Sequence, residues 1–166
     1  MTTAILRTSR RLALLIGRSP KANLVKSPPS QSPRIRWSPK LKKLRALSIR
    51  QPWAWLVVNG YKDIENRSWR TKHRGPLLIH ASSNRSLTTP QNLAAIKKKY
   101  RVRLPNDFDF GAIVGLVDVV DCMKTHPSKW KERGTWGWVL RNPRRLPSRE
   151  CKGFVGFFRL SGRRSS

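Results

Sequence analysis

Cysteine is scarce in this chain, which has only Cys122 and Cys151 among its 166 residues. The two lie far apart and form no C-x-x-C pair, which argues against a zinc knuckle. A disulfide cannot be inferred from two residues alone. Both are therefore expected to be ordinary buried or half-buried thiols.

Long apolar runs and familiar catalytic motifs are also missing. Stretches such as residues 12–16 are far too short to cross a bilayer, so we expect a soluble, cytoplasmic protein. The three histidines, His73, His80 and His126, show no metal-ligand spacing, and His80 on an apolar strand is expected to be structural. No P-loop, Rossmann glycine pattern or nucleophile elbow is present. We expect no metal and no cofactor.

Acidic residues are few, and the imbalance of charge is the strongest compositional signal. Lys and Arg total 36 against 8 Asp and Glu, a formal net charge of +28. Residues 1–45 contain twelve Lys or Arg and no acidic residue, but the rest of the chain is also strongly basic. Such a field favours polyanions, nucleic acid before anionic membrane. It carries no information on sequence specificity.

The composition changes near Leu44. Residues 1–43 are rich in Arg, Lys, Ser and Pro, and low hydrophobicity with high charge predicts disorder over most of them. Pro residues at 28, 29, 33 and 39 are expected to interrupt regular elements. Three readings of this tail stay open: a mitochondrial transit peptide, an RNA-binding arm, or upstream sequence included by a wrong start site. Residues 44–162 are expected to form one domain.

Within that domain the pattern predicts short strands with two inserted helices. Helices are expected after Gln51-Pro52, ending at Asn59-Gly60, and from Thr89 or Pro90 to about Tyr100. Turns are expected at Asn142-Pro143 and at residues 149–153. The expected strands are residues 46–49, an extended segment within 61–69, and residues 77–82, 111–122, 136–140 and 153–160.

One distinctive pattern of this domain is G-x-K-x-x-E-x-R, formed by Gly60, Lys62, Glu65 and Arg67. It stands among further ordered blocks at residues 47–54, 60–69, 74–81, 111–115, 137–140 and 153–158. Together these blocks resemble the ASCH family, of which that pattern is the signature. The resemblance covers about 115 residues. It implies an α+β fold, a small PUA-like mixed β-barrel with two or three covering helices, preceded by the disordered basic tail.

The resemblance also implies a cleft lined by the signature residues and a role in RNA metabolism or regulation, with RNA or a nucleotide-like ligand as partner. Fold alone does not dictate function, so a small hydrolase of the same fold stays open. It would be a ribonuclease or an amidohydrolase acting on a modified nucleoside, with Lys62 and Glu65 as catalytic residues. The amidohydrolase type carries a threonine nucleophile three residues after the pocket lysine. Here that position is Glu65, so the mechanism does not carry over.

The signature also makes a geometric prediction. On an extended segment Glu65 and Arg67 share one face, whereas Lys62 points to the other. A bulge or turn between Lys62 and Glu65 would bring both into one cleft. There they could form a structural ion pair, bind a polar ligand edge, or act as base and acid.

Aromatic and basic side chains extend the candidate site. Seven tryptophans are many for this length, and most are expected in the core. Trp69 and Trp136 are the candidates for stacking on a ligand, because they neighbour the signature and a Gly-rich turn. Arg74, in a dense basic loop, is a candidate phosphate contact. One of Trp53 and Trp55 is expected near the barrel mouth.

Overall fold

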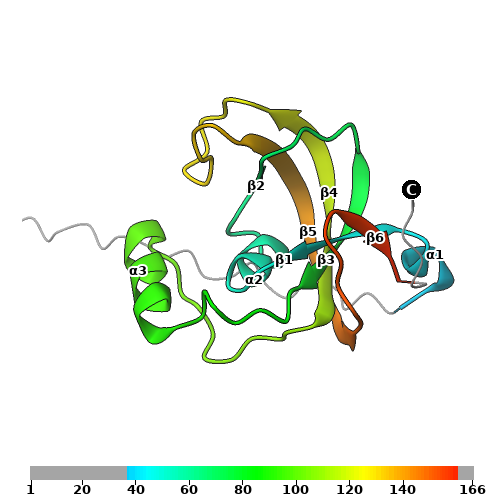
Figure 1. Cartoon of the computed structure of the whole chain (residues 1–166), viewed down its shortest axis with the longest axis horizontal. Helices are drawn as coiled ribbons and strands as arrows, with labels where there is room; N and C mark the ends of the chain where they lie inside the picture. Colours follow the sequence, from blue (N-terminus) through cyan, green and yellow to red (C-terminus); the bar gives the residue numbers. More distant parts are fainter. Residues whose placement is uncertain (1–36, 161–166) are drawn as a thin grey trace, which may run out of the picture.

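The computed structural model describes residues 37–160, which form one curled sheet with three helices (Figure 1). The helices are α1 (Pro39–Lys42), α2 (Trp53–Val58) and α3 (Pro90–Tyr100). The strands are β1 (Arg45–Ile49), β2 (Ile64–Arg67), β3 (Gly75–Ala81), β4 (Ala112–Met123), β5 (Trp136–Glu150) and β6 (Phe157–Arg159). The predicted α+β fold, a small mixed β-barrel with two or three covering helices, is confirmed in the form of a curled half-barrel sheet with three helices.

The six strands lie in the order β2-β5-β4-β3-β1-β6. Only β1 and β3 run parallel, and all other neighbours are antiparallel. The helix α2 and the strand β2 lie in the crossover between β1 and β3. The strand β2 forms one edge of the sheet and has a neighbouring strand on one side only. Signature side chains on β2 can therefore reach across the gap in the half-barrel to the strands at the other end of the sheet.

Side chains at the end of β2 and just beyond it contact β1 and β6, which lie at the opposite end of the sheet. Arg67, at the end of β2, donates to the carbonyl of Ser48 in β1 at 2.8 Å. Trp69, two residues beyond β2, packs edge-on against Phe157 of β6, with ring centroids 5.5 Å apart. The half-barrel is therefore closed on this side by a guanidinium and aromatic rings.

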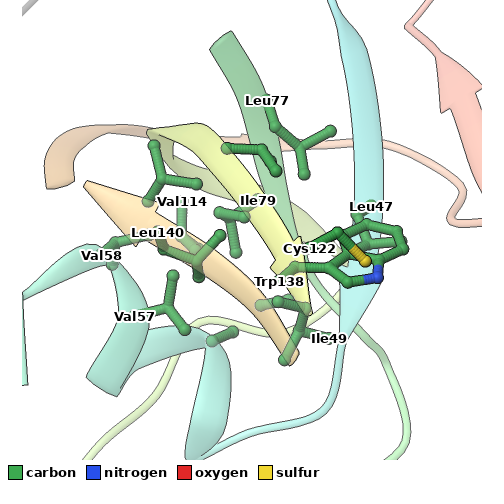
Figure 2. Close-up of a cluster of buried hydrophobic side chains, with 14 residues drawn as sticks. Leu47, Ile49, Val57, Val58, Leu77, Ile79, Val114, Cys122, Trp138 and Leu140 are labelled. Atoms are coloured by element: carbon green, nitrogen blue, oxygen red, sulfur yellow. The ribbon is translucent and has the colours of Figure 1, made fainter. Parts of the chain in front are cut away.

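The main core lies between α2 and the concave side of the sheet (Figure 2). Val57 and Val58 of α2 point at Ile79 and Leu140 of the strands. The helix approaches so closely that a Cβ on Gly115 of β4 would lie 2.5 Å from the Val58 side chain. Glycine at this position allows α2 to pack directly on the sheet. This close contact fixes the position of the helix that precedes the signature.

The chain just before residue 44 belongs to the folded part. Pro39 does not interrupt structure there but begins α1, because a proline in the first helical turn forfeits no hydrogen bond. Leu41 is buried in a second cluster with Phe158, and the Trp37 indole donates to the carbonyl of Pro147. Residues 1–36 lie outside the described residues, so the nature of the tail stays a prediction.

Most predicted elements are confirmed, and the principal error is in β5. Asn142-Pro143 was expected to turn the chain, but β5 continues through it to Glu150. Asn142 takes a left-handed conformation with φ of 49°, and the register against β4 shifts at three places. Bulges of this kind absorb a proline without ending the strand. The expected strand 153–160 is reduced to Phe157–Arg159.

Candidate functional site

The signature lysine lies in the turn that precedes β2. Gly60, with φ of +76°, ends α2, and the backbone N–H groups of Tyr61 and Lys62 both donate to the carbonyl of Leu56. Lys62 is therefore not part of an extended strand. The turn brings the Lys62 side chain to the same side as Glu65. Such a turn was expected from the sequence if the two residues were to share a cleft.

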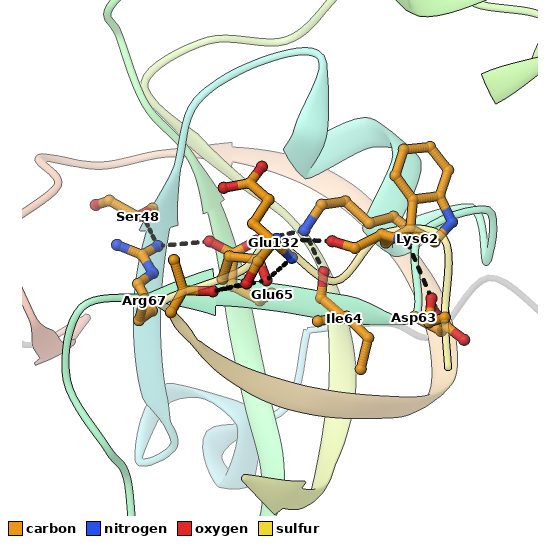
Figure 3. A network of polar contacts seen from close by, with 11 residues as sticks. Ser48, Lys62, Asp63, Ile64, Glu65, Arg67 and Glu132 are labelled. Carbon is orange, nitrogen blue, oxygen red and sulfur yellow. Dashed lines mark hydrogen bonds and ion pairs between the residues drawn. The ribbon is translucent and has the colours of Figure 1, made fainter. Parts of the chain in front are cut away.

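Lys62, Glu65 and Arg67 form a triad of charges (Figure 3). The Lys62 Nζ donates to Glu65 Oε2 at 2.9 Å and also to the carbonyl of Ile64. Arg67 lies 3.1 Å from Glu65 Oε1. Lys62 and Glu65 are only 6% and 7% exposed. Both carboxylate oxygens are thus engaged, and the two positive charges of the triad outnumber its one negative charge.

The triad has hydrogen-bond donors that its own contacts leave unused. An ammonium has three N–H bonds, and Lys62 uses two of them on the oxygens named above. Within residues 37–160, the Arg67 Nε is a buried side-chain nitrogen that has no hydrogen-bond partner. Buried donors are normally satisfied, so such an atom needs an explanation. The triad can still donate to a ligand that offers acceptor atoms.

A cavity of about 320 Å³ opens above the triad. This volume is at the small end of the range for ligand sites. The cavity is lined by Ser48, Ile49, Arg50, Trp53, Lys62, Glu65, Asn66, Arg67, Ser82, Tyr100, Trp130 and Glu132. One part of the lining is charged and includes the triad, and another part is aromatic.

Three rings form the aromatic wall, which we define as Trp53, Tyr100 and Trp130. Tyr100 and Trp130 stack at 4.0 Å between centroids, inclined by 17°. Trp53 meets both edge-on, at 6.1 and 6.2 Å. The three come from α2, the end of α3 and the loop before β5, so α3 is held in place by its contribution to this wall. Aromatic faces beside cations are suited to stacking a nucleobase.

The loop between β4 and β5, residues 124–135, is fixed to the signature strand. Asn66 donates to the carbonyl of Trp130 at 2.7 Å and accepts from the backbone N–H of Glu132 at 3.1 Å. The Ser128 hydroxyl donates to Asp63 at 2.5 Å. Asp63 and Asn66, which lie between the defining residues of the signature, thus position the loop that brings Trp130 and Glu132 to the cavity.

Three residues predicted to contact a ligand, Trp69, Trp136 and Arg74, do not line this cavity. Trp69 is 37% exposed, but its ring packs edge-on against Trp138 at 4.6 Å and does not line the cavity. Trp136 lies beneath the cations of Arg70 and Lys124. For Trp69 the difference arises because β2 ends at Arg67, so nearness in sequence to the signature does not place its ring in the cavity.

Arg74 is the third predicted ligand contact that does not line the cavity. It bonds Asp121 at 3.0 Å in a pair whose side chains are 42% and 48% exposed. The dense basic loop around Arg74 comprises Arg67, Arg70, Lys72, His73 and Arg74, and of these only Arg67 lines the cavity. Arg74 instead ties the loop to β4.

The lining residues that sequence reasoning missed come from separate parts of the chain. Arg50 follows β1, and Tyr100 closes α3. Trp130 stands in a loop between lysines, and an aromatic side chain in such a polar loop is the one signal that could have pointed to it. Trp53 matches the expectation that one tryptophan of α2 lies near the mouth, whereas Trp55 stacks on Tyr61 at 5.4 Å.

His80 has the structural surroundings expected from its strand. Its Nε2 lies 3.1 Å from the carbonyl of Cys151, which requires Nε2 to be the donor, and Nδ1 can then accept from the Ser48 hydroxyl at 3.1 Å. Burial lowers the pKa of His80, and hydrogen bonds to the carbonyls of Cys151 and Gly111 partly offset this effect. The ring is thus held neutral.

The described residues offer neither a metal-ligand cluster nor a membrane-spanning helix. Residues 37–160 contain no group of three or more His, Cys, Asp or Glu side chains that could hold a metal ion. In the same range no helix is long and apolar enough to span a bilayer. Cys122 and Cys151 are free thiols.

Comparison with known proteins identifies similar sequences. The family model described as ASCH domain matches residues 47–146. The chain is also similar to proteins named Activating signal cointegrator 1, at 42% identity in Homo sapiens and 43% in Mus musculus, each over 83 residues. The alignment covers 46% of this chain and only 14% of each of these relatives.

Proposed function

The chain belongs to the ASCH domain family, and on that premise we propose that it binds RNA by taking a nucleotide into the cavity above Lys62, Glu65 and Arg67. In this proposal the aromatic wall stacks on a base, while Lys62, Arg67 and Arg50 donate to its acceptor atoms or to a phosphate. The activities and partners of the full-length relatives are not assigned to this chain, because the chain spans only 14% of their length.

The observation that carries the proposal is the combination of a buried cationic floor and an aromatic wall in one cavity. Single-stranded nucleic acid is held by that combination, at about 1–3 kcal/mol for each stacked base. A purely structural ion pair would account for Lys62 and Glu65 alone. It would not account for the open space of about 320 Å³ or for the three rings around it.

The net charge of +28 supports an anionic partner and adds attraction at long range. The hydrolase alternative gains no comparable support. Both oxygens of Glu65 accept from neighbouring cations, and Lys62 donates to Glu65 and to Ile64. The observed contacts favour a role in binding.

The test compares two arginines that carry the same charge. Arg50 lines the cavity, whereas Arg141 lies on β5 outside it, and both are exposed. Labelled single-stranded RNA is titrated with the full chain as wild type, Arg50→Gln and Arg141→Gln. We expect Arg50→Gln to weaken binding several-fold more than Arg141→Gln, and the RNA to remain intact on a gel. Equal losses in the two variants would show that only overall charge is at work.

A further inference from the structure

Glu132 brings a second carboxylate to the cavity, and this one is not neutralised. It lines the same cavity as the triad (Figure 3), but it forms none of the ion pairs found among residues 37–160. Its side chain is exposed at the rim. In a chain with only 8 acidic residues, a free carboxylate beside Lys62 and Arg67 gives the cavity two different electrostatic regions.

The main chain of Glu132 is held firmly. Its N–H donates to Asn66 Oδ1 at 3.1 Å, and its carbonyl accepts from Lys131 Nζ and, at 2.8 Å, from the Thr135 hydroxyl. Lys131 also donates to the carbonyl of Thr135 at 2.9 Å, which closes the loop on itself. The carboxylate is thus presented from a fixed backbone.

An ionised carboxylate is selective because it accepts hydrogen bonds and cannot donate them. It repels phosphate and carbonyl oxygens, and it attracts amino groups. The cations of the triad have the opposite preference, because they donate to carbonyl oxygens and ring nitrogens. A base that offers an acceptor edge to the cations and an amino group to Glu132 satisfies both regions at once.

We propose that Glu132 is a specificity-determining residue that makes the cavity prefer bases with an exocyclic amino group over uracil. This inference rests on the RNA-binding function proposed above. Cytosine and uracil provide the closest comparison, because they differ mainly in an amine or a carbonyl at one ring position. Uracil offers only a ring N–H flanked by two carbonyl oxygens, which a carboxylate meets less favourably.

The experiment titrates the full chain with oligocytidylate and oligouridylate of equal length. Wild type is expected to bind oligocytidylate more tightly by about fivefold or more, the lower end for a hydrogen-bonded base contact. Glu132→Gln is expected to remove most of this preference, because an amide can donate to the uracil carbonyl as well as accept from an amine. Glu150→Gln, an exposed glutamate at the end of β5, is the control for lost charge and is expected to keep the preference.

Two results would count against the inference, and a third would count against its premise. Equal binding of both oligonucleotides by wild type would overturn it, and so would an unchanged preference in Glu132→Gln. If Arg50→Gln still weakens binding more than Arg141→Gln in either case, RNA binding at the cavity stands and only the selectivity is lost. If those two variants behave alike, the proposed function itself has failed.

Discussion

At the scale of single residues, Glu65 carries the negative charge that pairs with two cations, Lys62 and Arg67. It is 7% exposed and bonds Lys62 at 2.9 Å and Arg67 at 3.1 Å. A buried ion pair is weak evidence for stability by itself, but removing one member leaves an uncompensated buried charge. The identity of residue 65 therefore matters to the fold as well as to the cavity.

Replacing Glu65 is predicted to be costly. Glu65→Leu should lower the free energy of unfolding by about 3 kcal/mol, because Lys62 stays buried without its partner. Adding Lys62→Met should recover part of that loss. The matched control is Asp121→Asn, which breaks the exposed pair with Arg74 and should cost less than about 1 kcal/mol. Urea unfolding measures all three, and a Glu65→Leu loss no larger than that of Asp121→Asn would contradict the account.

His80 gives a prediction about pH. Its pKa in the folded chain lies below the ordinary 6.5, so the unfolded chain takes up a proton first as pH falls. The stabilisation is complete above pH 6.5 and is lost as pH falls from there through the lowered pKa. Unfolding free energies measured across this range should decline in wild type and decline less in His80→Gln. His73, whose pKa burial also lowers, is expected to contribute to the slope that remains. An identical slope in both proteins would exclude His80 as the cause.

The triad could be predicted from the sequence, but the wall of the cavity could not. Lys62, Glu65 and Arg67 lie within six residues, so a turn before a strand is enough to assemble them. Trp53, Tyr100 and Trp130 come together only when α2, α3 and a loop have packed. That depends on long-range contacts which spacing does not encode, and Trp69 was predicted in their place because it is near in sequence.

At the scale of elements, the strand β2 acts as the support of a loop. Asn66 and Asp63 hold residues 124–135 through contacts to Trp130, Glu132 and Ser128. The loop supplies part of the cavity wall without belonging to any regular element. Its position therefore depends on side-chain hydrogen bonds from the signature segment.

Asn66→Ala is predicted to loosen this loop and weaken RNA binding several-fold. The lost acceptor exposes the backbone N–H of Glu132, so hydrogen exchange should rise in residues 128–135 more than in the core strands. The control is Asn92→Ala on α3, whose side chain makes only a marginal contact of 3.5 Å to Ser86. If exchange in the loop is unchanged by Asn66→Ala, the loop is held by other contacts.

Most helices and strands could be predicted from the local sequence pattern. Thr89 accepts from the backbone N–H of Asn92 as an N-cap, and Pro90 begins α3 as expected. The pattern failed at Asn142-Pro143, because turn signals describe local preference only. The long pairing of β5 with β4 overrides them there through register shifts.

At the scale of the whole molecule, charge and cavity should contribute separately to RNA binding. The net charge of +28 attracts any polyanion, and counterion release makes that part depend on salt. The cavity contributes stacking and hydrogen bonds that salt affects much less. The two contributions can be separated by varying ionic strength.

We predict that affinity for single-stranded RNA falls linearly with salt on logarithmic axes, by about 0.7 for each phosphate neutralised. Trp53→Leu should lower affinity at every salt concentration without changing the slope, because it removes a stacking surface and no charge. Arg141→Gln should reduce the slope instead. Titrations at several salt concentrations measure both quantities, and a slope changed by Trp53→Leu would mean that the variant disturbs the charged surface.

The central claim is that an RNA base lies against the aromatic wall above the triad. Ultraviolet crosslinking of single-stranded RNA to the full chain, followed by mass spectrometry of the digested complex, tests it most directly. The account predicts crosslinks at Trp53, Tyr100 or Trp130, and their loss when excess unlabelled RNA is added. Crosslinks confined to exposed basic segments away from these rings would contradict it, because RNA would then be bound by charge alone.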